Sequence, residues 1–373
     1  HPAYVMRVWE AWGLAEHDLR RAKEESTTPE LVVPQRHYYL DPSDDVRQRL
    51  VAEMLGAQWL AVDIECWDDH SMACVGFADS ANRALVVPWR PETIADIELL
   101  CGSSVQKVLQ NGNFDATKLA QQGITLKNFA WETMIGHHTL MMESASGQDE
   151  MSVAMGRKKT SVLKKGLAFQ VSLYTKRPYY KDDGKLSRKT FDLNSYWRYN
   201  ADDCTSTWEI RQEQERLLNE EGTMGVFLEA MELVEPLSVI ERRGVRIDRS
   251  VMDSIRVQLE QEEQEHQAKL EQLVGRPVNV KSHKQVTELL YKTLKLPKRV
   301  KDGKLTADKH ALKGLYEKTK NPALRELLGV RERRDLKERY LHSGALSSDS
   351  RIRCNYDPTG TTTGRLSSRE SLL

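Results

Sequence analysis

The stretch Trp59-Leu-Ala-Val-Asp-Ile-Glu-Cys66 decides the fold of the first half of the chain. Its length and its apolar residues are typical of a buried β-strand. Two carboxylates, Asp63 and Glu65, are two residues apart, and because side chains alternate along a strand, both point to the same face. Burying two like charges is costly unless a cation compensates them, so this strand predicts a functional site as well as a fold.

The segments around this strand predict an α/β domain with a mixed sheet. Strands are expected at 72–78 and 84–89, joined by short polar connections that are typical of hairpins. A helix at 91–100 and a strand at 105–110 follow, and another helix then continues to residue 122. Three meandering strands followed by alternating helices and strands are typical of a sheet flanked by helices.

The second half of the chain is predicted to be mostly α-helical. After an irregular region that includes 174–181, a long helix is expected over about 195–220 and a glutamate-rich helix over 249–274. Ser282 is an N-cap signal for a further helix. A lysine-rich loop, 295–304, precedes the last pair of helices.

Charge is unevenly distributed along the 373 residues, although Lys plus Arg and Asp plus Glu both number 55. Residues 276–373 hold 23 basic and 11 acidic side chains, a net of +12, so residues 1–275 carry a net of −12. A basic end of this kind predicts binding of a polyanion, and randomly scattered solvated charge is the alternative explanation.

Composition argues against several classes of protein. No apolar run approaches the roughly 18–20 residues of a membrane span, and no secretory leader opens the chain, so neither a membrane nor a secreted protein is expected. The five cysteines are widely spaced without a Cys-x-x-Cys pair, which predicts neither a disulfide framework nor a structural zinc site. We therefore expect an intracellular, reducing location. The first residue is His1 rather than Met, which is compatible with a fragment of a longer protein.

Further acidic residues follow the pair on the first strand. Asp115 stands where a helix opens after the strand at 105–110, and Asp203 lies on the long helix, one turn after Tyr199. Carboxylate oxygens favour hard cations such as Mg²⁺ or Mn²⁺. Each pattern alone has an ordinary explanation: surface decoration for the first pair, helix capping for Asn111 and Asp115, and a solvated helix pair for Tyr199 and Asp203. Their order and spacing make the combination much more specific.

These segments resemble the three motifs of the DnaQ-like proofreading 3′→5′ exonucleases, in the subgroup with four acidic residues and a tyrosine. The resemblance implies a ribonuclease H-like fold, a single-stranded 3′ end of DNA as substrate, nucleoside 5′-monophosphates as products, and two Mg²⁺ or Mn²⁺ ions as cofactors. It implies four metal ligands, Asp63, Glu65, Asp115 and Asp203, and a residue that orients the attacking water, Tyr199. The other subgroup has histidine where this chain has Arg198, which favours the tyrosine version.

Two more residues of this region are candidates for contacts with DNA. Trp67 stands where the family commonly has a small or aliphatic series. It is predicted either to stack on the terminal base, as single-strand sites do, or to serve only in the core. Asn111 opens the second motif, with helix capping as its alternative role.

A second resemblance covers the rest of the chain. Segments 235–248, 278–286 and 361–368, the last reading Thr-Thr-Thr-Gly-Arg-Leu-Ser-Ser, resemble the start of the polymerase domain of family A DNA polymerases. The resemblance implies a parent DNA-directed DNA polymerase that acts in DNA replication, and a thumb that grips the primer–template duplex. The implied DNA contacts are Lys298, Arg299, Lys301 and Lys304 at the thumb tip and Arg365 at the primer terminus. The palm motifs with the polymerase aspartates are absent from these residues, so the chain as given is not expected to polymerise DNA.

The predicted organisation is an N-terminal extension, 1–54, an exonuclease domain, 55–222, and an incomplete polymerase thumb with the start of the palm, 223–373. The expected setting is the cytoplasm or nucleoid of a bacterium or phage-infected cell, or an organelle. Two alternatives stay open: a free-standing exonuclease resembling ribonuclease D, and a DNA-binding scaffold that has lost activity. Segment 361–368 argues against the first, and the presence of all four carboxylates argues against the second.

Overall fold

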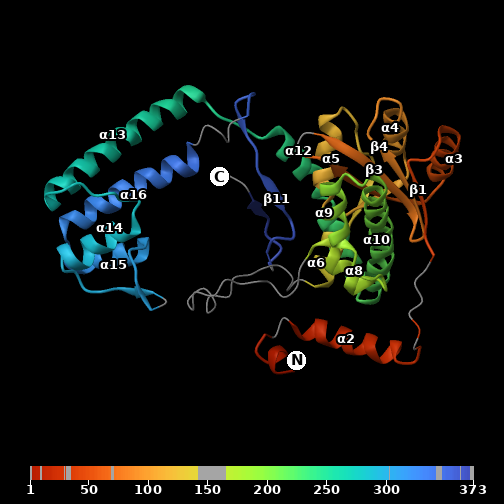
Figure 1. Ribbon diagram of the computed structural model, residues 1–373, viewed down its shortest axis with the longest axis horizontal. Helices are drawn as coiled ribbons and strands as arrows, with labels where there is room; N and C mark the ends of the chain where they lie inside the picture. The colour runs from red at the N-terminus through yellow and green to blue at the C-terminus, as the bar shows by residue number, and fades with distance from the viewer. Residues whose placement is uncertain are drawn as a thin grey trace. The chain divides into compact units, whose positions relative to one another are not determined.

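The structure is a computed structural model that describes residues 2–8, 11–28, 30, 35–68, 71–141, 165–301, 303–341, 347–361 and 363–369. Contacts divide the chain into two compact units, whose elements are labelled in Figure 1. Unit 1 comprises 1–240 and 356–367, and unit 2 comprises 241–355 and 368–373. Within the described ranges, no helix is both long enough and apolar enough to cross a membrane.

The helices and strands up to the end of unit 1's first segment are α1 (Pro2–Val5), α2 (Trp12–Glu25), β1 (His37–Leu40), α3 (Asp44–Leu55), β2 (Trp59–Cys66), β3 (Met72–Ser80), β4 (Arg83–Pro88), α4 (Ile94–Gly102), β5 (Gln106–Leu109), α5 (Gly112–Gln121), β6 (Phe129–Glu132), α6 (Thr133–Leu140), α8 (Leu167–Tyr174), α9 (Lys181–Thr190), α10 (Leu193–Glu220), α11 (Met224–Met231) and α12 (Val234–Arg243). Those that follow are β7 (Val245–Arg246), α13 (Arg249–Val274), α14 (His283–Glu288), the π-helix η3 (Leu289–Thr293), β8 (Val300–Lys301), β9 (Lys304–Leu305), α15 (Lys309–Thr319), α16 (Pro322–Tyr340), β10 (Arg351–Ile352), β11 (Asn355–Asp357) and β12 (Ser367–Arg369).

The core of unit 1 is a six-stranded mixed sheet with the strand order β1-β4-β3-β2-β5-β6. β2 is antiparallel to β3, and β3 is antiparallel to β4, as expected of the meander. β5 is parallel to both of its neighbours, β2 and β6, and β1 is parallel to β4. The predicted α/β fold with a mixed sheet flanked by helices is confirmed, and β2 covers the residues expected from the sequence.

Apolar side chains fill both faces of this sheet. On one face, helices α3, α4 and α5 contribute to a cluster that includes Leu50, Val62, Phe77, Leu100 and Leu119. On the other face, α10 crosses β1 to β4 and joins α6 and α11 around a second cluster that includes Ala61, Val86, Tyr196, Ala201 and Phe227. The long helix α10 is therefore the main cover of one side of the sheet.

The contacts in the structure differ from two predicted domain boundaries, those after residues 54 and 222. The predicted N-terminal extension, 1–54, contains β1, which pairs with β4, and most of α3, which brings Leu50 into the core. The predicted third domain began at 223, but Phe227 of α11 packs on Trp131 with ring centroids 4.2 Å apart. Both corrections have one cause: these segments bury apolar side chains on the sheet of unit 1, which no local pattern reveals.

Unit 2 is mostly helical, and α13 has the bounds expected from the sequence. α13 and α16 lie side by side and are joined by ion pairs, Arg333 to Glu262 at 3.0 Å and Lys337 to Glu263 at 2.6 Å (Figure 1). The predicted N-cap at Ser282 is confirmed, since its side chain accepts a hydrogen bond from the backbone N–H of Gln285. The apolar cluster of this unit includes Leu270, Val286, Leu290, Leu312, Leu324 and Val330.

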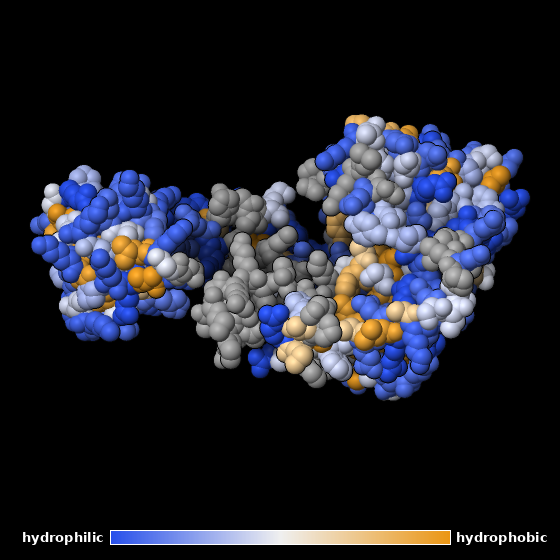
Figure 2. Space-filling model, turned by 60° about the horizontal axis from the view of Figure 1, so that its bottom comes forward, coloured by the Kyte–Doolittle hydropathy of each residue, from blue (hydrophilic) through white to orange (hydrophobic). Residues whose placement is uncertain are grey.

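The face of the molecule in Figure 2 is mostly hydrophilic, with hydrophobic residues in scattered groups on both units. This surface agrees with a sequence in which 29% of the residues are charged. Because apolar atoms make up a large part of the surface of any folded protein, these groups do not by themselves indicate a binding site.

α10 approaches β3 closely at Gly76. A Cβ atom at this position would lie 2.2 Å from Oδ1 of Asn200 and 2.6 Å from Sγ of Cys204, two buried side chains of α10. Gly76 pairs across the sheet with Asp63 of β2. The missing side chain therefore lets the helix lie against the sheet beside the first carboxylate of the predicted site.

We expect Gly76→Ala to destabilise unit 1 by about 1–3 kcal/mol, because an extra methyl group in a packed interface forces a shift of backbone or side chains. The same shift should reduce any activity that needs residues of both β2 and α10. Urea unfolding measures the first effect. Gly102→Ala is the matched control, since a Cβ at Gly102 has no atom within 4 Å. Equal stability of the two variants would contradict the close approach.

Candidate functional site

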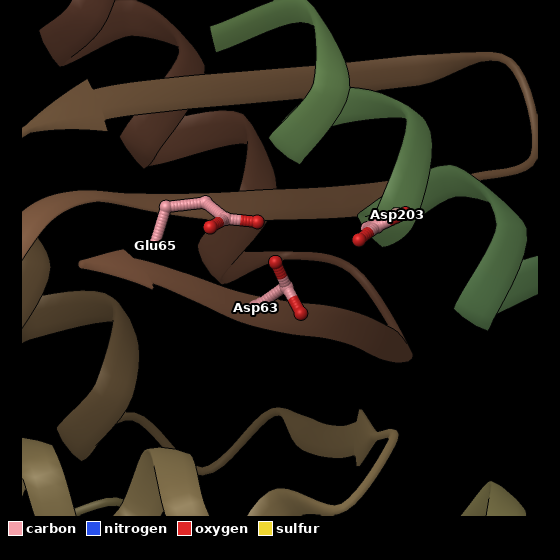
Figure 3. A group of neighbouring side chains, drawn as sticks. All are labelled: Asp63, Glu65 and Asp203. Carbon is pink, nitrogen blue, oxygen red and sulfur yellow. The ribbon is translucent and has the colours of Figure 1, made fainter. Parts of the chain in front are cut away.

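Three of the predicted carboxylates meet between β2 and α10. One ligand oxygen each from Asp63, Glu65 and Asp203 lies within 4.8 Å of the others. Figure 3 shows the three side chains pointing toward a common space. The two residues of β2 are partly buried and Asp203 is buried. A strand and a helix that are about 140 residues apart in the sequence thus build one acidic cluster.

Two neighbours of Asp203 on α10 hold the strand carboxylates in place. Nδ2 of Asn200 donates to a carboxylate oxygen of Asp63 at 2.8 Å. The hydroxyl of Tyr196 donates to Oε2 of Glu65 at 2.9 Å. These positions are three and seven residues before Asp203, so they share its helix face. Neither role was predicted from the sequence, although the polar residues repeated at helical spacing before Asp203 were a usable signal.

Asp115 is buried beside the cluster but is not one of the three residues whose oxygens lie within 4.8 Å of each other. Its Oδ1 accepts a hydrogen bond from the backbone N–H of Ile64 at 3.0 Å. This bond fixes the start of α5 against β2, between the two strand carboxylates. Asp115 is therefore close enough to act on the cluster electrostatically: after burial and the charges of Asp203 and Glu65, its charge also raises the pKa of Asp63.

The carboxyl groups resist ionising together. The pKa of Asp63 is well above its ordinary value, first because burial removes water from the charged form and then because Asp203, Glu65 and Asp115 repel it. Burial and the charge of Asp203 raise the pKa of Glu65 to about 7. Such a crowded group of carboxylate oxygens fits a hard divalent cation such as Mg²⁺ or Mn²⁺.

Tyr199 lies one turn before Asp203 on the same helix. Burial, and then the charges of Asp203, Glu65 and Asp63, raises the pKa of its hydroxyl far above the ordinary value. The hydroxyl therefore stays protonated at neutral pH. It can donate a hydrogen bond and orient a bound molecule, but it cannot serve as a strong base.

Two residues that the sequence analysis did not single out occupy both oxygens of Asp203. The hydroxyl of Tyr180 donates to Oδ1 at 2.7 Å, and Nζ of Lys181 lies 2.6 Å from Oδ2. They stand just before and at the start of α9, in a region that the sequence showed only as irregular. Neither has a spacing relation to the three motifs that could have revealed it.

Glu132 positions the start of the helix that carries Asp115. Its carboxylate accepts hydrogen bonds from the backbone N–H groups of Asn111 at 2.8 Å, Gly112 at 2.7 Å and Met134 at 3.1 Å. Asn111 itself is exposed and has a left-handed backbone, with φ at 60°. The alternative explanation of Asn111 as a cap receives no support, because its side chain makes no capping hydrogen bond. Its proposed contact with DNA stays a prediction.

Trp67 belongs to an aromatic cluster at the end of β2. Its ring centroid lies 5.2 Å from that of Tyr196, 5.9 Å from Trp197 and 6.0 Å from Phe191. The ring is partly buried. This packing is compatible with either of the two predicted roles, a platform for a base or part of the core, so stacking on DNA stays a prediction.

The remaining candidates are distributed over both units. β8 and β9 form a two-stranded antiparallel hairpin in unit 2, with Lys301 and Lys304 in its strands and Lys298 and Arg299 directly before it. Of these predicted thumb-tip side chains, Lys298, Lys301 and Lys304 are exposed and Arg299 is partly buried. Arg365 is exposed and falls in the returning segment of unit 1. Within segment 361–368, Thr362 lies outside the described residues.

Unit 2 also has an open cleft of about 830 Å³ that the sequence analysis did not foresee. Its lining is rich in basic side chains, namely Lys281, Lys309, Lys313, Arg325, Arg331, Arg333 and Arg334. Acidic partners neutralise some of them, as Glu263 does for Arg334 at 2.7 Å. The overall basic charge of the segment was visible in the sequence, but its concentration in one cleft depends on tertiary packing.

Comparison with known families identifies the C-terminal part of the chain. Residues 249–373 match the family described as DNA polymerase family A. A solved structure of similar fold is the POL domain of Pol1 from M. smegmatis, in complex with DNA primer-template and dNTP. It has a TM-score of 0.67 at 19% sequence identity, over 90% of this chain and 55% of that chain.

Curated relatives are bacterial DNA polymerases. DNA polymerase I of Synechocystis sp. is 25% identical over 281 residues, which cover 73% of this chain and 27% of the relative. The thermostable DNA polymerase I of Thermus caldophilus is 30% identical over 165 residues, 42% of this chain and 20% of the relative. The DNA polymerase I of Mycobacterium leprae is 32% identical over 142 residues, 37% and 15% respectively. This chain thus spans about a quarter or less of these relatives' length.

Glu132 should make the stability of unit 1 depend on pH. Burial raises its pKa from the ordinary 4.5 to about 7, so the folded state holds the proton more tightly than the unfolded state. Its contribution is therefore complete below about pH 4.5 and is lost as pH rises through 7, a change of up to about 3 kcal/mol.

Glu132→Gln should remove this dependence, so the gap in unfolding free energy between variant and wild type should change by up to about 3 kcal/mol between pH 5 and 8. Urea unfolding in EDTA at both pH values measures the gap. The exposed Glu98 provides the control Glu98→Gln, whose gap should stay constant. A pH-independent gap for Glu132→Gln would contradict the raised pKa.

Proposed function

We propose, from the premise that this chain belongs to DNA polymerase family A, that unit 1 is its proofreading 3′→5′ exonuclease. The reaction would be metal-dependent hydrolysis of the 3′-terminal phosphodiester of DNA, with release of nucleoside 5′-monophosphates. The observation that carries this proposal is the cluster of Asp63, Glu65 and Asp203, with Asp115 and Tyr199 beside it. A free-standing exonuclease is the weaker proposal, because it leaves the family match of residues 249–373 unexplained.

The cluster would hold two divalent cations, Mg²⁺ or Mn²⁺, through Asp63, Glu65 and Asp203, with Asp115 acting on the second ion. Bound there, such ions would supply an activated water and stabilise the leaving 3′-oxygen. The protein's own groups have three further tasks. Asn200 and Tyr196 orient the two strand carboxylates by hydrogen bonds. The protonated hydroxyl of Tyr199 orients the attacking water.

Unit 2 is proposed to be the thumb of the polymerase, where it would bind the backbone of a primer–template duplex. Support comes from the 23 basic against 11 acidic residues in 276–373, a segment that belongs to unit 2 except for 356–367, and from the basic cleft. Neutralisation of phosphates supplies most of the sequence-independent affinity for DNA. Polymerase activity and a role in replication are proposed only for a protein that also carries the palm and fingers.

Replacement of Asp63 and Glu65 together by Ala should abolish nuclease activity while binding of single-stranded DNA persists, because these carboxylates would hold the catalytic ions. The measurement is Mg²⁺-dependent release of 5′-monophosphates from a 3′-labelled single strand. The control removes two exposed carboxylates at the end of α10, Glu220 and Glu221, and should stay active. Activity of the wild type in EDTA, or of the double variant, would contradict the metal assignment.

Replacement of the hairpin side chains should weaken duplex binding in a salt-dependent way. A protein that neutralises phosphates shows a log–log slope of affinity against salt of about −0.9 per phosphate. In the quadruple Ala variant, this slope should become less steep by up to the contribution of about four phosphates. The change should be equal for all DNA sequences, because phosphate contacts do not read bases. The four positions are Lys298, Arg299, Lys301 and Lys304.

Fluorescence anisotropy with duplexes of two sequences measures this slope over a series of salt concentrations. The control variant replaces four exposed basic residues of unit 1 by Ala, namely Arg20, Lys23, Lys127 and Lys189. Single-strand hydrolysis should change far less than duplex binding, because the acidic cluster lies in the other unit. A slope equal to that of the wild type would mean that the hairpin is an ordinary solvated surface.

A further inference from the structure

Lys181 is placed among the carboxylates of the cluster. Its Nζ lies 2.6 Å from Oδ2 of Asp203, and the two side chains are only 19% and 5% exposed. The ammonium also lies over the ring of Tyr199, 4.5 Å from its centroid. A flexible surface lysine has no reason to adopt one such position, so the surroundings of this side chain require an explanation.

The segment before Lys181 is fixed on α10 by a buried arginine. The guanidinium of Arg177 donates to Oγ1 of Thr205 at 2.7 Å and to the hydroxyl of Tyr38 at 3.0 Å. It also bonds Oγ of Ser206 and the backbone carbonyl of Asp202. Its side chain is 2% exposed. Because Asp202 lies before Asp203 in the chain and Thr205 and Ser206 lie after it, the anchor fixes where Lys181 enters the site.

The helix that follows is also tightly packed at this point. Gly184 of α9 faces Tyr199, and a Cβ on it would lie 2.6 Å from the tyrosine ring. Tyr180, the residue before Lys181, donates to the other oxygen of Asp203. Both carboxylate oxygens of Asp203 thus already have a protein donor, one of them cationic.

A metal ion on Oδ2 of Asp203 would stand close to the ammonium of Lys181, which already contacts that oxygen. Mg²⁺ binds carboxylate oxygens at about 2.0–2.1 Å, so an ion on Oδ2 would lie within about 5 Å of Nζ in this arrangement. Two cations at that distance repel in a partly buried site, where water screens them poorly. The ion pair with Lys181 thus compensates part of the charge of the carboxylates, and the same contact would oppose metal binding.

We propose that Lys181 is a built-in counter-cation, which holds Asp203 and its neighbours together without metal and which a divalent cation must displace. The proposal rests on the proposed function in one respect, that the cluster binds metal. It adds a regulatory property that the carboxylates alone lack: the lysine sets the metal concentration at which the site fills.

The test measures binding of Mn²⁺ alone, without DNA, to the full chain by electron paramagnetic resonance of free Mn²⁺. Lys181→Met keeps the apolar stem but removes the charge. It should lower the dissociation constant of Mn²⁺ at least about fivefold, which is the lower end of the coupling that is typical between two binding sites. Lys181→Arg keeps the cation and should bind close to wild type. Lys189→Met, at an exposed position of the same helix, is the matched control and should not change the constant.

The outcomes separate this proposal from the proposed function. Lys181→Met could bind Mn²⁺ no more tightly than the wild type while Asp63→Ala/Glu65→Ala loses Mn²⁺ binding. That result would overturn the proposal that Lys181 is a counter-cation and leave the proposed function intact. Binding that is equal in wild type and in that double variant would overturn both proposals, because the ion would then not occupy the cluster.

Thermal unfolding is a second measurement, which keeps the proposal testable if Lys181→Met folds poorly without metal. Removal of the ammonium leaves the carboxylates without compensation, so the melting temperature of Lys181→Met in EDTA should fall below that of the wild type. Saturating Mn²⁺ should then raise it by more than it raises the wild type. An equal or smaller rise would overturn the proposal.

Discussion

Mutual repulsion of carboxylates is the constraint on which the rest of unit 1 depends. Asp63 and Glu65 on β2 and Asp203 on α10 gather at one point, with Asp115 beside them, and burial makes their charges still more costly. No packing of apolar side chains would bring these groups together. The surrounding protein must therefore hold them in place, and the hydrogen bonds from Asn200, Tyr196 and the backbone of Ile64 do so.

The long helix α10 links this constraint to the fold. One face of it covers the sheet with Ala201 and Cys204, and the adjacent positions present Asn200 and Asp203 to β2. A bulky residue on β3 would keep the helix away, which is why the glycine at position 76 matters for the site as well as for packing. Stability and chemistry thus depend on the same interface, and neither can be altered there alone.

The sequence revealed those parts of this arrangement that local patterns encode. β2 and α13 have the expected bounds because an apolar run and a capped helical repeat are local signals. The order and spacing of the segments that carry Asp63, Glu65 and Asp203 were visible in the sequence, and the structure brings these three carboxylates together, while their role stays a prediction. Leu50 and Phe227 were assigned to the wrong segments because their burial depends on contacts with distant strands.

Positioning residues were the hardest to predict. Glu132 acts through three backbone N–H groups, two of them about 20 residues earlier in the chain. Because every residue except proline has such a group, the residue types of the partners give no signal in the sequence. Lys181 looks like one of many charged residues in an irregular segment. Its position depends on Arg177, which fixes the segment by hydrogen bonds to three side chains and one backbone carbonyl of residues far away in the sequence.

Unit 1 is discontinuous, since the chain leaves it at residue 240 and returns to it at 356–367. The returning segment supplies the hydroxyl of Thr359, which accepts from Nζ of Lys165 at 2.9 Å, while Asp357 lies 4.0 Å from the same nitrogen. During synthesis, unit 1 can therefore reach its complete set of contacts only after all of unit 2's main segment has left the ribosome. A fragment cut at residue 240 would lack those partners, so the shortest sequence that preserves unit 1 needs a linker that replaces unit 2 rather than a simple truncation.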